Sequence, residues 1–416
     1  MILKNEKMVD QSNKKSYLVN TISILFMLYI ACTIIFRMKY IYITYAIDCI
    51  LISLFSLLVF MKKLKLFKIN RIVFSYFVLS VFALASSFWA LNFTHAMLKG
   101  FQLLFISINM FIIYNLIKNY HIERFFIYGV LLGSFVNYLL VFRIIPTFIE
   151  LYTGPRLVGT MGNSNPFAVT MVISIVVSIV YLSLEKEKPK EKSSSLLYYY
   201  QYINIIFSLY LIILSISRAG IVFGFTLVFL YIVISMKDFK SFIRLSIVIT
   251  IIMIIVVNFI NLDDFWEVYD RVLHRFGALE EGIENADSRV GSTAIRIYLA
   301  KLGLQAFMDN PIIGVGVNNF MIYSGGIYSH NNYIELLAGL GIVGFIIFYS
   351  MHIFVLYKAS QVSSTDLKIV FAFFVLVMFG MDMAGGSYYG KLILYTLLMA
   401  YLILERSNNV EEKRYE

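Results

Sequence analysis

The feature that most constrains this chain is a series of apolar blocks, each about 17–25 residues long and nearly free of charge. Blocks of this length cross a lipid bilayer, where the backbone must satisfy its hydrogen bonds internally. They are continuous apolar runs and lack the alternating pattern of a membrane β-barrel. The sequence therefore predicts an all-α integral membrane protein with about twelve transmembrane helices.

The blocks fall on both sides of one long polar segment, residues 261–331. This divides the chain into residues 1–260 with helices one to nine, an extracytoplasmic loop at 261–331, and residues 332–416 with three helices and a cytoplasmic tail. The first block lacks a small-residue cleavage site, so we expect an uncleaved helix. Residues 202–236 exceed one bilayer thickness and are interrupted at Ser217-Arg218-Ala219-Gly220, which favours two spans over one long helix. The spans are expected near residues 18–36, 41–61, 72–91, 97–117, 125–145, 166–184, 202–216, 219–236, 242–260, 332–356, 367–384 and 392–404.

The long loop itself contains a stretch with helical periodicity. Its apolar positions are Ile295, Leu299, Leu302, Ala306 and Phe307, whereas Arg296 and Lys301 fall between them. This spacing predicts an amphipathic, interfacial helix that ends before Pro311.

Orientation follows from the preference of Lys and Arg for cytoplasmic loops. With the N-terminus inside, the cytoplasmic segments hold 23 of the 35 Lys and Arg residues. The short outer connections hold 7, and the remaining 5 lie in the long loop, which the rule discounts. Both termini are therefore expected on the cytoplasmic side of a bacterial inner membrane.

The composition excludes several other classes of protein. A chain with 60% hydrophobic and 14% charged residues has too little polar surface for a soluble domain. Its net charge of +10 needs no nucleic-acid partner, because basic connections attract anionic lipid headgroups. Cys32 and Cys49 both lie within apolar spans, so neither a disulfide framework nor a cysteine-based metal site is indicated.

Four polar features, far apart in sequence, are predicted to reach the same outer face. Each has an ordinary structural alternative: an Arg at a helix end is often an interfacial anchor, and a lone His before a span is often structural. Their arrival on one side favours a site. They are Gly159-Thr160-Met161-Gly162-Asn163-Ser164-Asn165-Pro166, Ser217-Arg218-Ala219-Gly220, Arg296 with its loop, and Ser329-His330-Asn331-Asn332.

The residue types in these features suit transfer from a diphosphate. The planar guanidinium groups of Arg218 and Arg296 make bidentate contacts with phosphoryl oxygens, and both remain charged. His330, with an ordinary pKa of about 6.5, can accept a proton from a sugar hydroxyl at neutral pH. Together these side chains describe glycosyl transfer from a lipid diphosphate.

Other polar residues are second-rank candidates. Asn163 and Asn165 can bind sugar hydroxyls or cap the helix that follows at Pro166. Arg156 can join a basic cluster at the mouth of the site. Asn331 follows His330 directly, and Glu335, one helical turn past Asn331, can face His330. Asp48, inside an apolar span, is either functional or bonded to a neighbouring helix.

No metal ligand is expected in this site. The outer segments contain no Asp-x-Asp pair, and the first outer loop, Arg37 to Tyr40, contains no carboxylate. The sequence therefore predicts a metal-independent reaction in which arginine supplies the positive charge. No cofactor is indicated.

The motifs resemble the O-antigen ligase and Wzy-type polysaccharide polymerase superfamily over about residues 155–345. The resemblance is carried by Ser217-Arg218-Ala219-Gly220, by Arg296 before Pro311-Ile312-Ile313-Gly314-Val315-Gly316, and by His330-Asn331 before Gly339-Leu340-Gly341. It implies a twelve-helix fold of the GT-C type and a glycan donor on undecaprenyl diphosphate. It further implies that Arg218 and Arg296 contact the diphosphate and that His330 activates or orients the acceptor hydroxyl. Ala300 stands where members of the family often carry Trp.

Three hypotheses for the function remain. A polymerase would transfer the glycan onto a lipid-linked repeat unit, and a ligase would transfer it to a different acceptor. A transporter of lipid-linked sugar is less favoured, because transporters place polar sites near the membrane midplane on broken helices. Polymerase is preferred, since the Ile-, Lys- and Asn-rich composition suggests an AT-rich genome and a bacterium that has a capsule. A flippase and a chain-length regulator would then be further partners.

Overall fold

The structure is a computed structural model that describes residues 2–36, 41–147, 149–186, 195–235, 243, 269–271 and 292–415. Two sets of helices flank a gap in this description. The first set comprises α1 (Ile2–Ile35), α2 (Ile41–Phe60), α3 (Arg71–Ala85), α4 (Phe93–Tyr120), α5 (Glu123–Val141), α6 (Ser164–Lys186), α7 (Ser195–Ser215) and α8 (Arg218–Ser235). The second set comprises α11 (Ser292–Asp309), α12 (Phe320–Tyr323), α13 (Asn332–Gln361), α14 (Thr365–Asp382) and α15 (Lys391–Tyr415).

Short elements complete the fold near the helix ends. They are the 3₁₀ turns η1 (Ser86–Phe88) and η2 (Gly159–Met161) and the strands β1 (Tyr152–Thr153) and β2 (Arg156–Leu157). The two strands form an antiparallel hairpin in which Thr153 pairs with Arg156.

The prediction of an all-α membrane protein is confirmed. Among the residues that the structure describes, eight helices, namely α1 to α7 and α13, are long and apolar enough to cross a membrane, and α8 is a shorter apolar helix. Within the described residues, eleven of the expected spans coincide with helices. These are the nine helices just named together with α14 and α15, which cover the last two expected spans. The expected span at 242–260 and nearly all of residues 261–291 lie outside the described residues. The total of twelve spans and the GT-C fold stay predictions.

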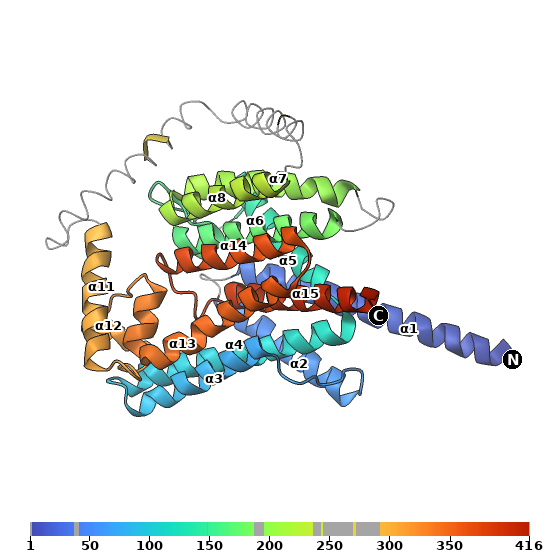
Figure 1. The fold of residues 1–416 in the computed structure, drawn as a ribbon, viewed down its shortest axis with the longest axis horizontal. Helices are drawn as coiled ribbons and strands as arrows, with labels where there is room; N and C mark the ends of the chain where they lie inside the picture. The colour runs from blue at the N-terminus through green and yellow to red at the C-terminus, as the bar shows by residue number, and fades with distance from the viewer. Residues whose placement is uncertain are drawn as a thin grey trace.

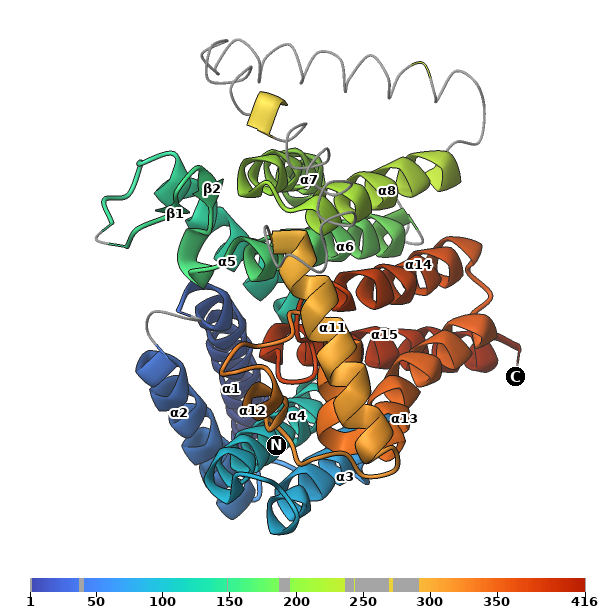
Figure 2. The same cartoon turned by 90° about the vertical axis from the view of Figure 1, so that its left-hand side faces the viewer.

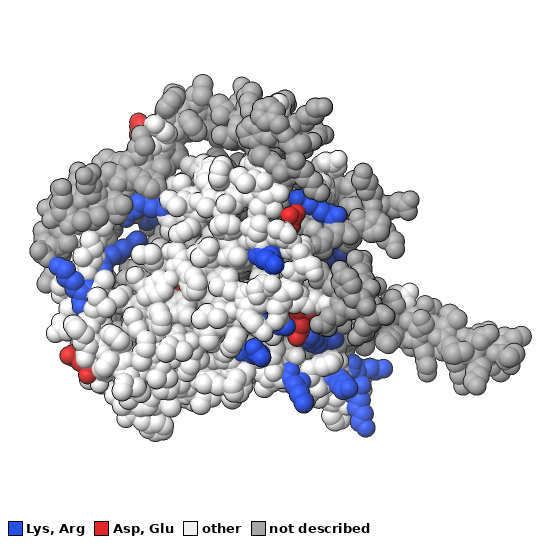
Figure 3. Space-filling model, in the orientation of Figure 1, with Lys and Arg blue, Asp and Glu red and all other residues white. Residues whose placement is uncertain are grey.

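The spans run in a common direction and alternate between two ends of the bundle (Figure 1). The end that carries α11 and α12 also holds the C-terminal end of α1 and the turns after α3, α5, α7 and α14, which belong to the side predicted to lie outside. The helix α11 runs crosswise over this end, as Figure 2 shows, in the manner of a helix that lies along a membrane surface. Lys and Arg lie mainly toward the two ends in Figure 3, and the broad surface between them is largely uncharged.

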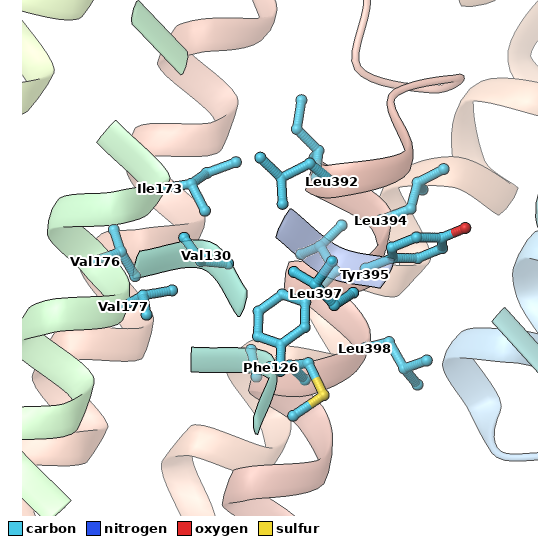
Figure 4. Packing of buried hydrophobic residues seen from close by; sticks show 14 of the residues in the cluster. Phe126, Val130, Ile173, Val176, Val177, Leu392, Leu394, Tyr395, Leu397 and Leu398 are labelled. Carbon is cyan, nitrogen blue, oxygen red and sulfur yellow. The ribbon is translucent and has the colours of Figure 1, made fainter. Parts of the chain in front are cut away.

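One part of the hydrophobic core lies where α5, α6 and α15 meet (Figure 4). Close packing holds helices together in lipid, because lipid tails are as apolar as the side chains themselves. The labelled side chains in Figure 4 come from these three helices and are Phe126, Val130, Ile173, Val176, Val177, Leu392, Leu394, Tyr395, Leu397 and Leu398, all fully or almost fully buried.

A break in α13 explains the glycine motifs of the sequence. Gly341 adopts φ 63° and ψ −166°, so the helix changes direction there and leaves backbone groups without helical partners. The segment Pro311–Gly316 supplies the missing hydrogen-bond partners. Ile342 N donates to Pro311 O at 2.9 Å, and Val315 N donates to Ala338 O at 2.9 Å. A Cβ on Gly314 would lie 2.4 Å from the Gly339 backbone. Glycine is therefore required for this backbone-to-backbone packing.

The predicted helix forms over Ser292–Asp309 and ends before Pro311, and part of its apolar stripe packs against the bundle. Leu299 and Ala306 are fully buried and pack with Phe320 of α12 and Ile334 of α13. Ile295, which was expected on the apolar face, is 38% exposed. The contact with α12 and α13 therefore covers only part of the apolar stripe.

Candidate functional site

The structure brings the three predicted catalytic residues to the same end of the bundle. Arg218 is the first residue of α8, and its Nη2 donates to Thr293 Oγ1 of α11 at 3.1 Å. Thr293 and Arg296 lie three residues apart and so share one side of α11. His330 precedes α13, and Arg296 is near enough for its charge to act on the imidazole. The helix α11 therefore connects both arginines to the histidine.

The electrostatics of this group favour a neutral histidine. Burial lowers the pKa of His330 below its ordinary value of 6.5, and the positive charge of Arg296 lowers it further. At neutral pH the imidazole is therefore uncharged and can accept a proton.

The backbone around His330 is held in an uncommon conformation. His330 has a backbone φ of 57°, in the left-handed region that few residues other than glycine adopt. On one side, Ser329 N donates to Glu335 Oε1 at 2.9 Å, and Ser329 Oγ donates to Asn331 O at 2.9 Å. The Tyr328 ring meets the imidazole edge to face at 5.5 Å between centroids. Such strain persists only where surrounding contacts enforce it, and functional sites are a common place for it.

Two predicted binding residues shape this loop. Asn331 caps α13, because its Oδ1 accepts from Tyr333 N at 2.9 Å and from Ile334 N at 3.2 Å. Glu335 is 4% exposed and accepts the Ser329 N–H, so one of its oxygens is committed to the loop. Both residues position His330.

A second cluster lies at the start of α6. Asn165 Oδ1 accepts from Ser217 Oγ at 3.1 Å and from Arg156 Nη2 at 3.5 Å, and Asn165 Nδ2 donates to Ala384 O at 3.3 Å. Asn163 Oδ1 accepts from Asn165 N at 3.0 Å, which satisfies a backbone donor at this helix end. The capping role considered for Asn163 is thus present in the fold.

The β1–β2 hairpin carries Arg156 toward the end of α7. Its Nε donates to Ser215 O at 3.2 Å, and its Nη2 donates to Ile216 O at 3.4 Å. These carbonyls belong to the last residue of α7 and to the residue after it, where helical partners are missing. Arg156 therefore binds the turn that leads into Arg218.

A cavity of about 330 Å³ opens beside His330. Its walls come from α1, α2, α4, the start of α6, the loop before α13 and the segment between α14 and α15. Of the predicted site residues, Asn163, Asn165 and His330 line it, whereas Arg156, Arg218 and Arg296 do not. The lining residues are Thr33, Thr44, Tyr45, Gln102, Ile106, Asn163, Asn165, Pro166, Tyr328, His330, Ala384, Gly385, Gly386, Tyr389, Lys391 and Leu392.

Asp48 has a bonded partner on neighbouring helices, one of the two readings considered from the sequence. Its carboxylate forms an ion pair with Lys391 of α15 and accepts from Tyr29 Oη of α1 at 2.9 Å. Asp48 is fully buried, and Lys391 lies at the cavity wall. Sequence reasoning missed Lys391, although a Lys at the start of one span and an Asp within another form a possible pair.

Lys99 is another residue that sequence reasoning missed. It lies on α4, and its Nζ is 3.5 Å from the centroid of the Tyr389 ring and 5.5 Å from that of Tyr388. Cation–π contacts of this kind offset the loss of water around a buried ammonium group. A Lys within an apolar span was the available signal.

The part of the chain that the structure describes contains no group of three or more His, Cys, Asp or Glu residues placed to hold a metal ion.

Residues 203–349 match a family model described as O-antigen ligase. No curated protein matches the chain. The matched segment contains Arg218, Arg296 and His330, and it ends close to the residue 345 at which the sequence resemblance was expected to end, although it begins later than residue 155. Over residues 203–349 the chain is therefore similar to the O-antigen ligase family, which supports the resemblance to the O-antigen ligase and Wzy-type superfamily seen in the motifs.

Proposed function

We propose that this protein is a glycosyltransferase that polymerises a surface polysaccharide, moving a glycan from undecaprenyl diphosphate onto a lipid-linked repeat unit. One observation carries the proposal. Two arginines and a neutral, partly buried histidine, from three separate segments, meet beside a cavity at one end of a membrane bundle.

The arginines are assigned to the donor. The diphosphate carries the negative charge that builds up on the leaving group as the sugar–phosphate bond breaks. Arg218 and Arg296 supply permanent positive charge and planar donors for phosphoryl oxygens. The contact between Arg218 and Thr293 joins α8 to α11, the helix that carries Arg296. Because arginine supplies this charge, we propose that the reaction needs no divalent metal.

His330 is assigned to the acceptor. The acceptor hydroxyl oxygen attacks the anomeric carbon of the donor sugar and forms the new glycosidic bond. The bond from that carbon to the phosphate oxygen breaks, and undecaprenyl diphosphate leaves with the electron pair. The hydroxyl proton passes to the imidazole of His330, whose lowered pKa keeps it unprotonated beforehand.

The charge bias of the connections supports the side of the membrane. The end that carries the site has few Lys and Arg in its short loops, as extracytoplasmic ends do. We therefore place the site on the outer face of a bacterial inner membrane, with both termini in the cytoplasm. Lipid-linked donor and acceptor would reach it from the outer leaflet, and a flippase and a chain-length regulator would act beside it.

A ligase is the second candidate, favoured by the description of the matching family. It would use the same donor and the same three residues but a different acceptor. Incubating the purified protein with its native lipid-linked repeat unit alone separates the two. A polymerase extends that unit into longer chains, whereas a ligase leaves it unextended until another acceptor is added.

The assignment of roles is tested by separating binding from chemistry. Arg218→Lys and Arg296→Lys keep the charge but lose the planar fork, so both should weaken diphosphate binding and lower turnover. His330→Ala should leave donor binding unchanged and slow single-turnover transfer by about 100-fold to 10,000-fold. Undecaprenyl diphosphate binding and transfer would be measured in the same nanodiscs. Normal binding and transfer by both Arg variants would refute the clamp, and wild-type transfer by His330→Ala would refute the base.

A further inference from the structure

The cavity beside His330 has walls suited to an uncharged saccharide. Its volume of about 330 Å³ is near the lower end of the range for small-molecule sites. Among the lining residues the only charged groups are Lys391 and the titratable His330, and Lys391 is ion-paired with Asp48. A ligand with its own negative charge would have to compete with Asp48 for that ammonium group.

Two side-chain amides on the walls have hydrogen-bonding capacity to spare. Within the described part of the chain, the Gln102 amide has no hydrogen-bond partner, and Asn163 uses only its oxygen, to accept from Asn165 N. Gln102 lies on α4 one turn before Ile106, which also lines the cavity. An amide carries both donors and an acceptor, so it can bind hydroxyl groups in either direction.

Aromatic rings supply the apolar part of the wall. Tyr45, Tyr328 and Tyr389 line the cavity, and the rings of Tyr328 and Tyr389 pack edge to face with centroids 6.3 Å apart. Rings of this kind offer broad apolar faces with a polar tip. A sugar ring has the matching surface, with C–H groups on its faces and hydroxyls around its edge.

The position of the cavity indicates which reactant it receives. Neither Arg218 nor Arg296 lines it, whereas His330 does and is also near enough to Arg296 to be affected by its charge. His330 is thus the one of these three residues that both lines the cavity and lies near Arg296. A general base must touch the hydroxyl that it deprotonates.

We propose that this cavity binds the terminal, uncharged sugar of the acceptor glycan, with Gln102 hydrogen-bonded to its hydroxyls and its reactive hydroxyl directed to His330. The proposal rests on the proposed function for the identity of the reaction. The new part of the proposal is that the acceptor binds in this cavity and that its terminal sugar carries no charge.

The test uses an acceptor that cannot act as a donor. The repeat-unit oligosaccharide, released from its lipid by mild acid, lacks the diphosphate and so serves only as acceptor. Full-length protein in nanodiscs would receive this oligosaccharide at varied concentration and the lipid-linked unit at fixed concentration. Gln102→Leu should raise the KM for the oligosaccharide by about tenfold, the usual effect of losing one or two neutral hydrogen bonds. Binding of undecaprenyl diphosphate should not change, which also shows that the variant is folded.

The control is Gln361→Leu, the same substitution at an exposed position at the C-terminal end of α13, the end away from His330. Direct binding of the released oligosaccharide, measured calorimetrically without donor, gives a readout that needs no turnover. If Gln102→Leu raises the KM for the donor alone, or changes neither KM nor oligosaccharide affinity, the acceptor subsite is refuted. If wild-type protein binds the oligosaccharide through Gln102 but transfers nothing, the subsite stands and the proposed reaction fails.

Discussion

Asn332 joins three parts of the site. Its replacement should lower the free energy of unfolding more than the replacement of an exposed asparagine does. It is fully buried at the start of α13, two residues after His330. Its Nδ2 donates to Tyr349 Oη at 3.1 Å and to Asp382 Oδ2 at 3.2 Å. Its Oδ1 accepts from the backbone N of residues 387 and 388 at 2.9 and 3.0 Å. These bonds fix the segment between α14 and α15, which forms one wall of the cavity.

The size of the effect follows from these four hydrogen bonds. Side-chain hydrogen bonds inside membrane proteins contribute about 0.6 kcal/mol each to stability. Losing four of them in Asn332→Leu should therefore lower the free energy of unfolding by about 2.4 kcal/mol. Leaving the Asp382 carboxyl and two backbone donors with fewer partners raises the loss to about 4 kcal/mol. The unfolding equilibrium constant should therefore increase by about 50-fold to 1,000-fold.

The loss would be measured as the change in free energy of unfolding in a detergent titration of the purified protein. Asn310→Leu is the control, because Asn310 is exposed after the end of α11. Transfer should also fall in conditions where Asn332→Leu is still folded, since the cavity wall loses its attachment to α13. Equal stability of the Asn332 and Asn310 variants would refute this account of the network.

Three further predictions concern topology, metal and pH. In a cysteine-free background, a single cysteine at Met308 should react with an impermeant thiol reagent from outside, and one at Lys63 should not; the reverse pattern would refute the orientation. Transfer by the purified protein should persist in excess chelator, and full loss restored by magnesium or manganese would contradict the arginine-based mechanism. Because burial and Arg296 lower the His330 pKa, the base is lost only as pH falls through the lowered value. The acid limb of kcat/KM should therefore lie below pH 6.5, and a limb above it would contradict the assignment.

The sequence by itself determined the class of fold and the membrane segments. A block of apolar residues has few alternatives to a spanning helix, because an unpaired backbone group in lipid costs several kcal/mol, on the order of the loss expected at Asn332. The predicted topology also brought Arg218, Arg296 and His330 to one face, and in the structure they lie at one end of the bundle. Their chemical roles stay predictions.

Tertiary structure alone decided how the polar residues pair. Asp48 and Lys391 are 343 residues apart, and no local pattern specifies that their helices are neighbours. The same applies to Gln102, whose place on the cavity wall depends on how α4 is rotated against α1 and α15. The burial of Leu299 but not Ile295 likewise depends on where α11 touches α13. Local sequence sets which face of a helix is apolar, but contacts between distant helices determine which part of that face is buried and which polar groups meet.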